Sequence, residues 1–467
     1  MRGTAIILFT LMTSSAAAAT LDKTLSCGRP GEAGGLAGGT ALTRVIIDNG
    51  RYPEAVCNDA TPAVYYISPY IREEDRNKWV IFLQGGGGCG GGQECASRWC
   101  SSGTNFGMDK MSSSTSKQGI DGHGIFDRRE TNRFGSWNHV LVFYCSSDNW
   151  AGNKLNKLSA SGDSGSTIEF DIHFRGAKII EAVIDTLRKP GATRGRGVRR
   201  GGPIPAPGST TLPDLDEATE VLLAGSSAGG GGVRNNADKV GTILRASNVH
   251  CSGSSTCHLV YRAAVDASFG PESEDIDFSR STFCAFDPAF CAYEGFFAAR
   301  YDSTVVATWG AQLDDSCVAW HRANAPGTEW RCGDGEHLFS NHISSELFAR
   351  QDLQDQLLTG NFVEAGLGSA QDFGSLQESD LREFPTIFAR AEEGPFASGG
   401  KSVAVFGPQC TDHESFTSNR AFYNVKVTQN GAAYSFHDVL WNWWNGASPQ
   451  VVIRPFTGRP GEAPECP

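Results

Sequence analysis

The sequence lacks the basic excess that a nucleic-acid-binding protein needs. Its 40 Lys and Arg residues are outnumbered by 52 Asp and Glu residues, which gives a formal net charge of −12 at pH 7. Proteins that neutralise phosphates present a net or local positive charge. We therefore expect no nucleic acid among the partners. A chain of 467 residues can bury a full core, and we expect one large α/β domain.

Long apolar runs are also missing after the first residues. Residues 1–19 combine Arg2, the apolar stretch AIILFTLM and a tail of small residues, which is the pattern of a secretory signal peptide. That stretch is too short to span a bilayer, and no later run approaches 20 apolar residues. We expect residues 20–467 to form a single secreted domain, monomeric and without stable membrane insertion.

Cysteine, by contrast, is abundant. An even count of 14 in an exported chain predicts a framework of disulfides. A zinc site built from Cys89, Cys95 and Cys100 is disfavoured because no second Cys/His half-site accompanies them. Close spacing predicts three short bridges: Cys251 with Cys257, Cys284 with Cys291, and Cys317 with Cys332.

Short apolar runs alternate with helix-like segments along the chain. This alternation is typical of βαβ units around a largely parallel sheet. Nearly continuous apolar runs predict strands over 78–84, 139–145, 220–225, 259–266, 295–302 and 401–407, and helical spacing predicts helices over 174–188 and 235–244. The segment 189–214 is rich in Gly, Pro and Arg, and we expect an exposed loop there. Its arginines suit an anionic polymer, although a solvated loop is the simpler interpretation.

The segment EVLLAGSSAGGGGVRNNAD contains the pattern G-x-S-x-G at Gly225 to Gly229. An apolar strand precedes the pattern and a helix follows it, as a nucleophile elbow requires. In such an elbow a sharp turn exposes the serine oxygen, and small neighbours let the backbone close up. Ser227 is therefore the candidate nucleophile. The alternative is a glycine-rich turn with a serine that caps the helix.

A serine hydroxyl needs a histidine to accept its proton and a carboxylate to orient that histidine. On an elbow of this kind the chain order is serine, carboxylate, histidine. Asp266 and Asp302 end predicted strands, and strand-end position favours Asp302. Four histidines follow: His337, His342, His413 and His437. His413 comes soon after a predicted strand and is preferred, but the residues alone leave His437 open.

Seven glycines interrupted only by Cys89 follow the predicted strand at 78–84. Ordering such a run costs more backbone entropy than ordering other residues, so it indicates a need for bare backbone. Ester hydrolysis through a serine forms a tetrahedral oxyanion, which backbone N–H groups of an early glycine-rich loop stabilise. A phosphate-binding loop is disfavoured because the Gly-Lys-Ser/Thr ending is absent.

Seven segments appear in the order seen in one known family: FLQGGGGC, VFYCSSDNWAGN, FRGAKIIEAVID, LLAGSSAGGGGVRNNAD, VDASF, RYDSTVVATWGAQL and GPQCTDHESF. Over about residues 60–445 the chain resembles the pectin acetylesterase and Notum family of serine carboxylesterases. The resemblance implies an α/β-hydrolase-like fold with a mostly parallel central sheet flanked by helices and with disulfide-stapled loops. It also implies cofactor-free ester hydrolysis outside the cell, with no metal ligands.

The family's motifs fall on particular residues of this chain. The resemblance places the catalytic groups on Ser227, Asp302 and His413, and the oxyanion-hole amides on Gly86, Gly87 and Ala228. Asp266 matches an aspartate outside the catalytic set, and we expect it to be structural or to form part of a pocket. Notum-like members carry a tryptophan where this chain has Gly87.

The expected function is removal of O-acetyl groups from an acylated extracellular polysaccharide by a serine esterase similar to pectin acetylesterases. A basic loop and an open cleft would suit an acidic polysaccharide. The first alternative is a Notum-like carboxylesterase that removes a fatty acyl group from a protein or lipid. The second alternative is a secreted binding protein that has lost turnover.

Overall fold

A computed structural model describes Leu21, Leu25, Cys27, residues 39–101, 106–162, 165–188, 212–251, 257–388 and 402–458, and Cys466. The predicted signal peptide and most of the predicted loop at 189–214 lie outside the described residues.

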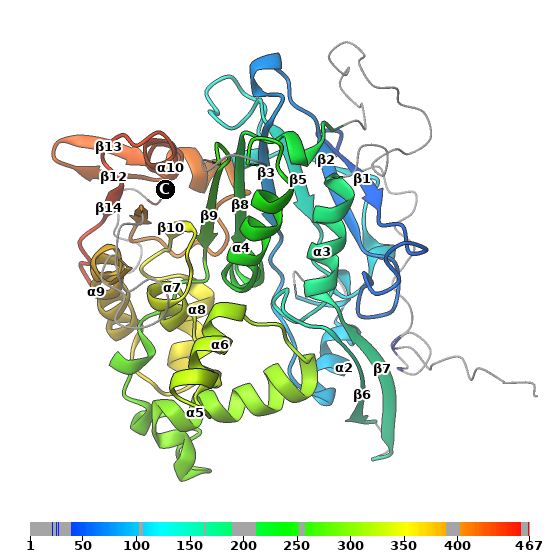
Figure 1. Cartoon of the computed structure of the whole chain (residues 1–467). Helices are drawn as coiled ribbons and strands as arrows, with labels where there is room; N and C mark the ends of the chain where they lie inside the picture. The colour runs from blue at the N-terminus through cyan, green and yellow to red at the C-terminus, as the bar shows by residue number, and fades with distance from the viewer. Residues whose placement is uncertain are drawn as a thin grey trace, which may run out of the picture.

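A ten-stranded sheet runs through the described structure in the order β14-β11-β10-β9-β8-β3-β5-β2-β1-β4 (Figure 1). Its strands are β1 (Leu42–Ile46), β2 (Val64–Ser68), β3 (Lys78–Leu83), β4 (Gly119–Ile120), β5 (Asn138–Val142), β8 (Glu220–Ser226), β9 (Val260–Asp266), β10 (Glu346–Arg350), β11 (Val403–Gly407) and β14 (Val451–Ile453). Neighbouring strands are parallel from β14 to β5. Strands β2, β1 and β4 add an antiparallel edge. The expected mostly parallel sheet is confirmed.

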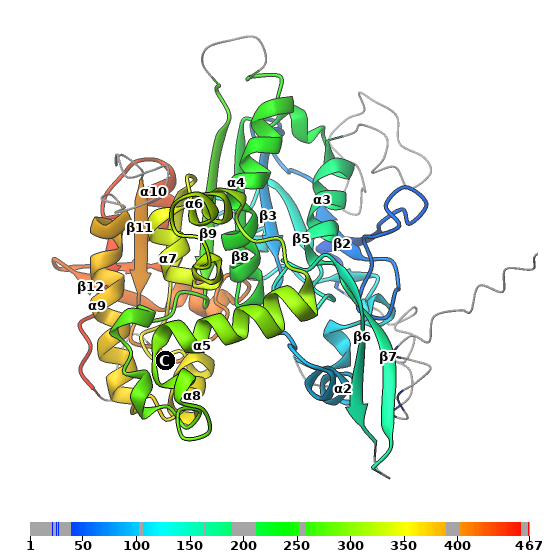
Figure 2. The same ribbon diagram turned by 60° about the horizontal axis from the view of Figure 1, so that its bottom comes forward.

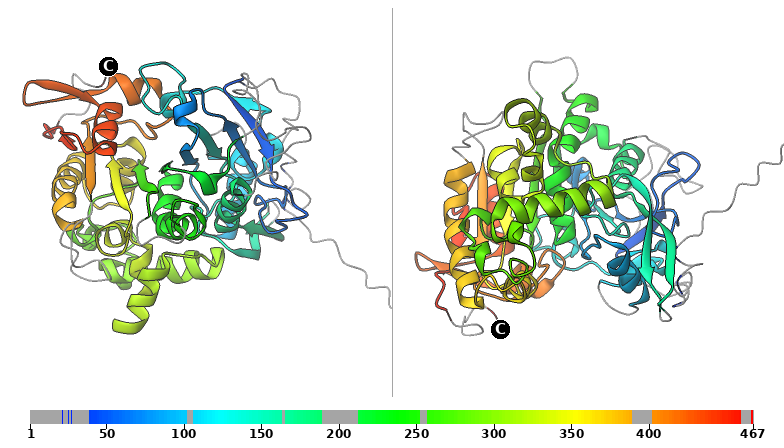
Figure 3. Two further views of the ribbon diagram at one scale, coloured as in Figure 1. Left: turned by 45° about the horizontal axis from the view of Figure 1, so that its top comes forward. Right: turned by 90° about the horizontal axis from the view of Figure 1, so that it is seen from below.

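Helices cover the sheet, and Figure 3 shows them on both sides of it. The helices are α2 (Gly92–Cys100), α3 (Gly176–Leu187), α4 (Ala228–Ser247), α5 (Tyr293–Arg300), α6 (Asp315–Asn324), α7 (Gly335–Asn341), α8 (Gln356–Glu364), α9 (Ala370–Phe388) and α10 (Phe436–Trp444). The helix α3 buries Ile179, Val183 and Leu187, as its spacing predicts. On α10, Phe436 stacks on Phe348 of β10 and Phe406 of β11. Central strands are thus buried on both faces, which explains their continuous apolar sequences.

Two antiparallel hairpins accompany the sheet. They are β6 (Lys154–Ser161) with β7 (Thr167–Phe174), and β12 (Lys426–Gln429) with β13 (Ala432–Ser435). Helix α5 continues into a π-helical segment, η9 (Tyr301–Trp309), which crosses the molecule toward the first hairpin (Figure 2). Asn156 of β6 donates hydrogen bonds to the carbonyl oxygens of Ala307 and Thr308 and so ties η9 to that hairpin.

One strand prediction is wrong. The segment 295–302 forms most of α5 and the start of η9 instead of a strand. Its apolar side chains are only partly buried, and the rings of Tyr293 and Phe297, one helical turn apart, lie 5.3 Å from each other. A segment with one solvent-exposed side need not be a buried strand. Its Ala-Ala-Arg sequence favours a helix, because Ala and Arg have high helix propensity. The other predicted strands and both predicted helices are confirmed.

All 14 cysteines are paired in seven disulfides. The three predicted short bridges are confirmed. The remaining bridges are Cys27–Cys100, Cys57–Cys145, Cys89–Cys95 and Cys410–Cys466. These pairs exclude the zinc interpretation of Cys89, Cys95 and Cys100. Among the described residues, no helix combines the length and apolar character needed to cross a membrane.

Candidate active site

Ser227 stands at the turn between β8 and α4, as the elbow pattern predicts. Its φ is 55° and its ψ is −124°, a strained conformation for a residue with a side chain. Its N–H donates to the backbone oxygen of Asp266 at 2.9 Å, and its carbonyl accepts from Gly231 at 3.1 Å. The strained turn is therefore held from both sides, which is the arrangement of a nucleophile elbow.

Small residues around Ser227 let the backbone segments approach one another. A Cβ atom on Gly229 would lie 1.9 Å from the carbonyl oxygen of Leu83, at the end of β3. A Cβ atom on Gly85, at the start of the glycine run, would lie 2.9 Å from the Cβ of Ser227. The elbow and the glycine run are thus in direct contact, and neither position has room for a larger residue.

Gly86 and Gly87 have positive φ values of 149° and 67°, which side chains disfavour. Arg98 of α2 donates to the carbonyl oxygen of Gly86 at 2.5 Å. Because the carbonyl and the N–H of one peptide unit point in opposite directions, this bond also fixes the N–H of Gly87. Within the described part of the chain, the N–H groups of Gly86 and Gly87 donate to no protein atom. The Gly87 donor is therefore both oriented and available, and the Gly86 donor is available.

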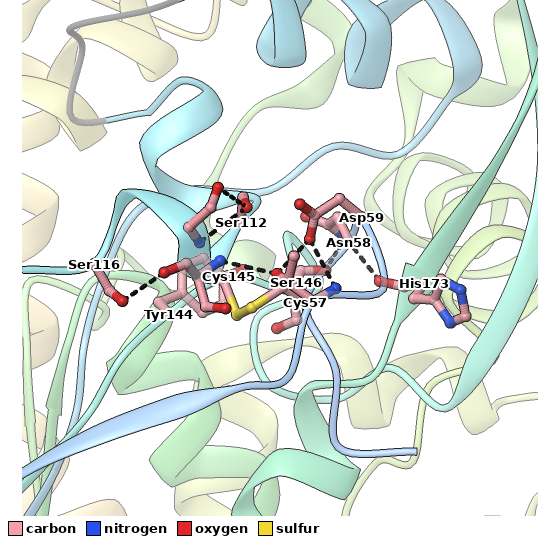
Figure 4. Close-up of a disulfide and its surroundings, with 12 residues drawn as sticks. Cys57, Asn58, Asp59, Ser112, Ser116, Tyr144, Cys145, Ser146 and His173 are labelled. Carbon is pink, nitrogen blue, oxygen red and sulfur yellow. Dashed lines mark hydrogen bonds between the residues drawn. A yellow bond between two sulfur atoms is a disulfide. The ribbon is translucent and has the colours of Figure 1, made fainter. Parts of the chain in front are cut away.

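The loop after β5 braces the glycine run. The carbonyl of Ser147 accepts a hydrogen bond from the N–H of Cys89 at 3.0 Å, and its hydroxyl accepts one from Arg98. Asn58 fixes this loop by donating to the carbonyl oxygens of Ser146 and His173, each at 2.8 Å. Figure 4 shows the Asn58 contacts beside the Cys57–Cys145 disulfide, which closes the same region covalently.

His413 follows β11 and forms a close pair with Asp355. Its Nδ1 lies 2.9 Å and 2.8 Å from the two carboxylate oxygens of Asp355. The side chain of Asp355 is fully buried, and that of His413 is 8% exposed. Burial lowers the pKa of His413, but the hydrogen bond and charge of Asp355 outweigh it and raise the pKa above 6.5. The Nε2 atom is buried and has no partner among the described residues.

The structure corrects the predicted carboxylate. Asp302 lies exposed on η9 and does not contact His413; Asp355, which follows β10, does. The expectation that Asp302 ends a strand is wrong, because 295–302 is helical. The true strand, ELFAR, neighbours β9 and β11 in the sheet, and its end therefore meets the histidine loop. Recognising that short apolar run as a strand would have pointed to Asp355.

Asp266 connects the elbow to the histidine loop. One carboxylate oxygen accepts hydrogen bonds from the Ser226 hydroxyl at 2.7 Å and from the backbone N–H groups of Ser415 at 2.5 Å and Phe416 at 3.2 Å. The other carboxylate oxygen accepts a hydrogen bond from Arg350 at 3.1 Å. The side chains of Asp266 and Arg350 are both fully buried. Since Ser226 precedes Ser227 and Ser415 lies two residues after His413, a single carboxylate sets both positions. The expectation that Asp266 is structural fits these contacts.

His437 occupies a different environment. Its Nε2 accepts a hydrogen bond from the N–H of Arg133 at 3.1 Å, and its ring packs against Phe134, Phe422 and Tyr423. The His437 side chain therefore packs far along the chain from the loop of His413, and it is this latter loop that Asp266 joins to the elbow.

Two partly buried charged side chains flank the glycine run. The stem of Lys110 packs against Gly86, and a carboxylate oxygen of Glu414 lies over Gly85. Burial lowers the pKa of Lys110 to about 8, with Glu414 acting in the opposite direction, and burial raises the pKa of Glu414. A cation therefore balances the carboxylate beside the N–H donors, which keeps the surroundings suitable for a developing negative charge.

A small pocket of about 40 Å³ adjoins the end of the glycine run through Trp309, and neither Ser227 nor His413 lines it. Trp309 lines it and donates its indole N–H to the carbonyl of Cys89 at 2.8 Å, and its ring lies 3.5 Å from where a Cβ on Gly88 would be. The apolar part of the wall comes mainly from Phe297, Tyr301, Val305, Trp309, Leu313 and Trp330. The polar part comes from Asn149, Arg234, Asn235 and Arg300.

The chain is similar to known carboxylesterases. A family model described as pectinacetylesterase matches residues 37–198. The palmitoleoyl-protein carboxylesterase notum2 of Xenopus laevis is 30% identical over 353 residues, which cover 72% of this chain and 58% of that protein. The human palmitoleoyl-protein carboxylesterase NOTUM is 28% identical over 346 residues, with coverages of 72% and 58%. The chain thus spans about 58% of the length of these relatives.

Solved structures support the fold. A structure of the Wnt deacylase Notum from Drosophila aligns with a TM-score of 0.61, covering 91% of this chain and 99% of that chain at 22% identity. The large sheet flanked by helices is accordingly the α/β-hydrolase-like fold that the sequence predicts.

We expect Asp266→Asn to lower the free energy of unfolding by about 3 kcal/mol, because it leaves the buried Arg350 without one of its charge partners. Asp302→Asn is the matched control and should change stability by less than about 0.5 kcal/mol, since Asp302 is exposed. Urea unfolding with the disulfides intact measures both. Equal effects of the two substitutions would show that Asp266 does not hold the site together.

Proposed function

Because the chain belongs to the pectin acetylesterase and Notum family, we propose that it is an exported serine carboxylesterase. Ser227 is the nucleophile, His413 the general base and Asp355 the carboxylate that orients the histidine. Gly86, Gly87 and Ala228 supply the oxyanion hole. The observation that carries this assignment is the Asp355–His413 pair, in a loop that Asp266 joins to the strained elbow of Ser227; the Nε2 of His413 has no partner among the described residues.

The chemistry follows from these positions. His413 Nε2 accepts the proton of the Ser227 hydroxyl as Oγ attacks the ester carbonyl, and Asp355 stabilises the imidazolium that forms. The oxyanion is held by the N–H groups of Gly86, Gly87 and Ala228, of which Ala228 begins α4 and so has no helical acceptor. His413 then returns the proton to the leaving alcohol. Water repeats the sequence on the acyl-enzyme and releases the acid.

The substrate we favour carries a fatty acyl group on a protein or lipid. The relatives' names, palmitoleoyl-protein carboxylesterase and Wnt deacylase, refer to substrates of this kind. Trp309, Val305 and Phe297 give the small pocket beside the glycine run an apolar wall, and this pocket would have to widen to admit an acyl chain. Trp309 comes from η9, so this wall does not need a tryptophan at the position of Gly87.

A second candidate is O-acetyl removal from an acidic polysaccharide. The pectinacetylesterase match favours it, and so do Arg234 and Arg300, which line the same pocket and suit a carboxylated sugar. The carboxylate of the sugar would then lie in the pocket where the first candidate places the acyl chain.

Hydrolysis of p-nitrophenyl esters from acetate to octanoate separates the candidates. Fatty deacylation predicts that kcat/KM rises with chain length, and that Val305→Trp, which fills the pocket, abolishes the rise. Val306→Trp is the control, because the neighbouring Val306 is 50% exposed and outside the pocket lining. A fall with chain length, together with release of acetate from an acetylated acidic polysaccharide, supports the second candidate. No hydrolysis of any ester would support a binding protein without turnover.

Asp355→Asn should lower kcat by at least about a hundredfold, because the amide no longer stabilises the imidazolium. The acid limb of the kcat/KM profile should also move to lower pH, since His413 must be neutral to act and loses the charge that raises its pKa above 6.5. Asp302→Asn should change neither quantity. A large loss with Asp302→Asn and a small one with Asp355→Asn would reverse the assignment.

Gly87→Ala should lower kcat by at least about tenfold while KM for p-nitrophenyl acetate changes little. The added Cβ is strained at a φ of 67° and meets Phe106 and Arg98, so the N–H turns away from the oxyanion. Gly91→Ala is the matched control in the same run, because Gly91 is extended at a φ of −155° and its Cβ would meet nothing within 4 Å. Similar kinetics for the two variants would exclude Gly87 as a donor.

A further inference from the structure

Three histidines from one disulfide-bonded segment converge away from the proposed catalytic residues. His321 lies on α6, His337 lies on α7, and His342 follows α7 directly. One ligand atom of each, together with Sγ of Cys317, lies within 4.8 Å of the others. The imidazole rings are 5.1 to 5.5 Å apart between centroids. We propose that His321, His337 and His342 form a binding site for a divalent transition-metal ion, with zinc as the best match.

The spacing of the nitrogens suits a metal. Nε2 of His321 and Nε2 of His337 share a hydrogen bond at 3.0 Å, which an ion bound between them would replace. Two nitrogens bound to tetrahedral zinc at about 2.0–2.1 Å lie about 3.3 Å apart, so a small opening of the pair admits the ion. Three imidazoles without a carboxylate ligand favour zinc, copper, nickel or cobalt over calcium or magnesium, which prefer oxygen.

A neighbouring hydroxyl orients one ligand. Thr328 donates its hydroxyl hydrogen to the carbonyl of Ala325 at 2.6 Å, so its oxygen accepts from Nδ1 of His321 at 2.7 Å. This bond places the ring hydrogen on Nδ1 and leaves the Nε2 lone pair directed at the cluster. Metal-bound histidines are typically held in this way through their second nitrogen.

The fourth coordination position is left to water. Cys317 lies in the cluster, but its sulfur is bonded to Cys332 and is not a thiolate. His321 and His342 are buried, whereas His337 is half-buried, so water and the ion reach the site from the side of His337.

The ion would brace one wall of the substrate pocket. Leu313 precedes α6, and Trp330 and Gly333 precede α7; all three line the pocket. The Cys317–Cys332 bridge already links these segments. Zinc would add a second cross-link between α6 and α7 and stabilise the folded state.

The test uses the full oxidised chain, dialysed against a chelator and titrated with ZnCl2 by calorimetry. We expect one Zn²⁺ per chain, a higher melting temperature with Zn²⁺, and the intense visible absorption of tetrahedral Co²⁺ when cobalt replaces zinc. His321→Ala and His337→Ala should each weaken Zn²⁺ binding at least tenfold. His250→Ala, which removes an exposed histidine, should leave it unchanged.

Thr328→Val keeps all three ligands and should also weaken binding at least tenfold, because His321 loses its orienting acceptor. This variant carries the test if a histidine variant does not fold, as judged by circular dichroism. Equal affinity for Zn²⁺ in wild type and His337→Ala, no saturable binding, or binding only after reduction of Cys317–Cys332 would each overturn the proposal. None of these measurements depends on ester hydrolysis.

Discussion

The buried carboxylate of Asp266 is the interaction on which the geometry of the site depends. It lies at the end of β9, between the elbow that follows β8 and the loop that follows β11, and it accepts hydrogen bonds from both. Arg350, at the end of β10, pairs with it and also with Asp352, at 2.8 Å. A buried ion pair contributes little net stability compared with apolar packing, but losing one partner is costly. Its value here is positional: four neighbouring strand ends are held in one arrangement.

A second constraint is the bare backbone of the glycine run. Ordering glycine is unfavourable, and this chain offsets the cost with contacts that reach the run from outside. Arg98 holds the carbonyl of Gly86, Ser147 holds the N–H of Cys89, and the Cys89–Cys95 bridge closes the run onto α2. These contacts fix N–H groups that have no acceptor in the described structure. The geometry is thus prepared before any substrate arrives, which is what oxyanion stabilisation requires.

Local patterns in the sequence were enough to find some parts of the site but not all. Ser227 and the glycine run could be predicted because their chemistry depends on a strand, a turn and adjacent small residues. Asp355 could not, because its position depends on which strands are neighbours. ELFAR is only five residues long, and GFFAARYD looked more like a buried strand although it packs as a half-exposed helix.

The disulfides between distant cysteines could not be predicted from the sequence for the same reason. Cys57 and Cys145 are 88 residues apart, and only the folded sheet brings them together. The three predicted bridges join cysteines that are neighbours along the chain; Cys89–Cys95 is just as short but was missed, because Cys100 lies equally near Cys95. His321, His337 and His342 likewise become a cluster only when α6 packs beside α7. Contacts between distant segments, more than local structure, were what the sequence left open.

Covalent labelling of the nucleophile is the most direct measurement. The full oxidised chain would be treated with a fluorophosphonate, which reacts with activated serines, and the adduct would be located by peptide fragmentation. Fragmentation must separate Ser227 from Ser226, whose hydroxyl donates to Asp266 and is not free to react. We expect one adduct per chain, on Ser227, with complete loss of ester hydrolysis. An adduct on Ser226 or on another hydroxyl, or hydrolysis that persists after Ser227 is labelled, would contradict the assignment.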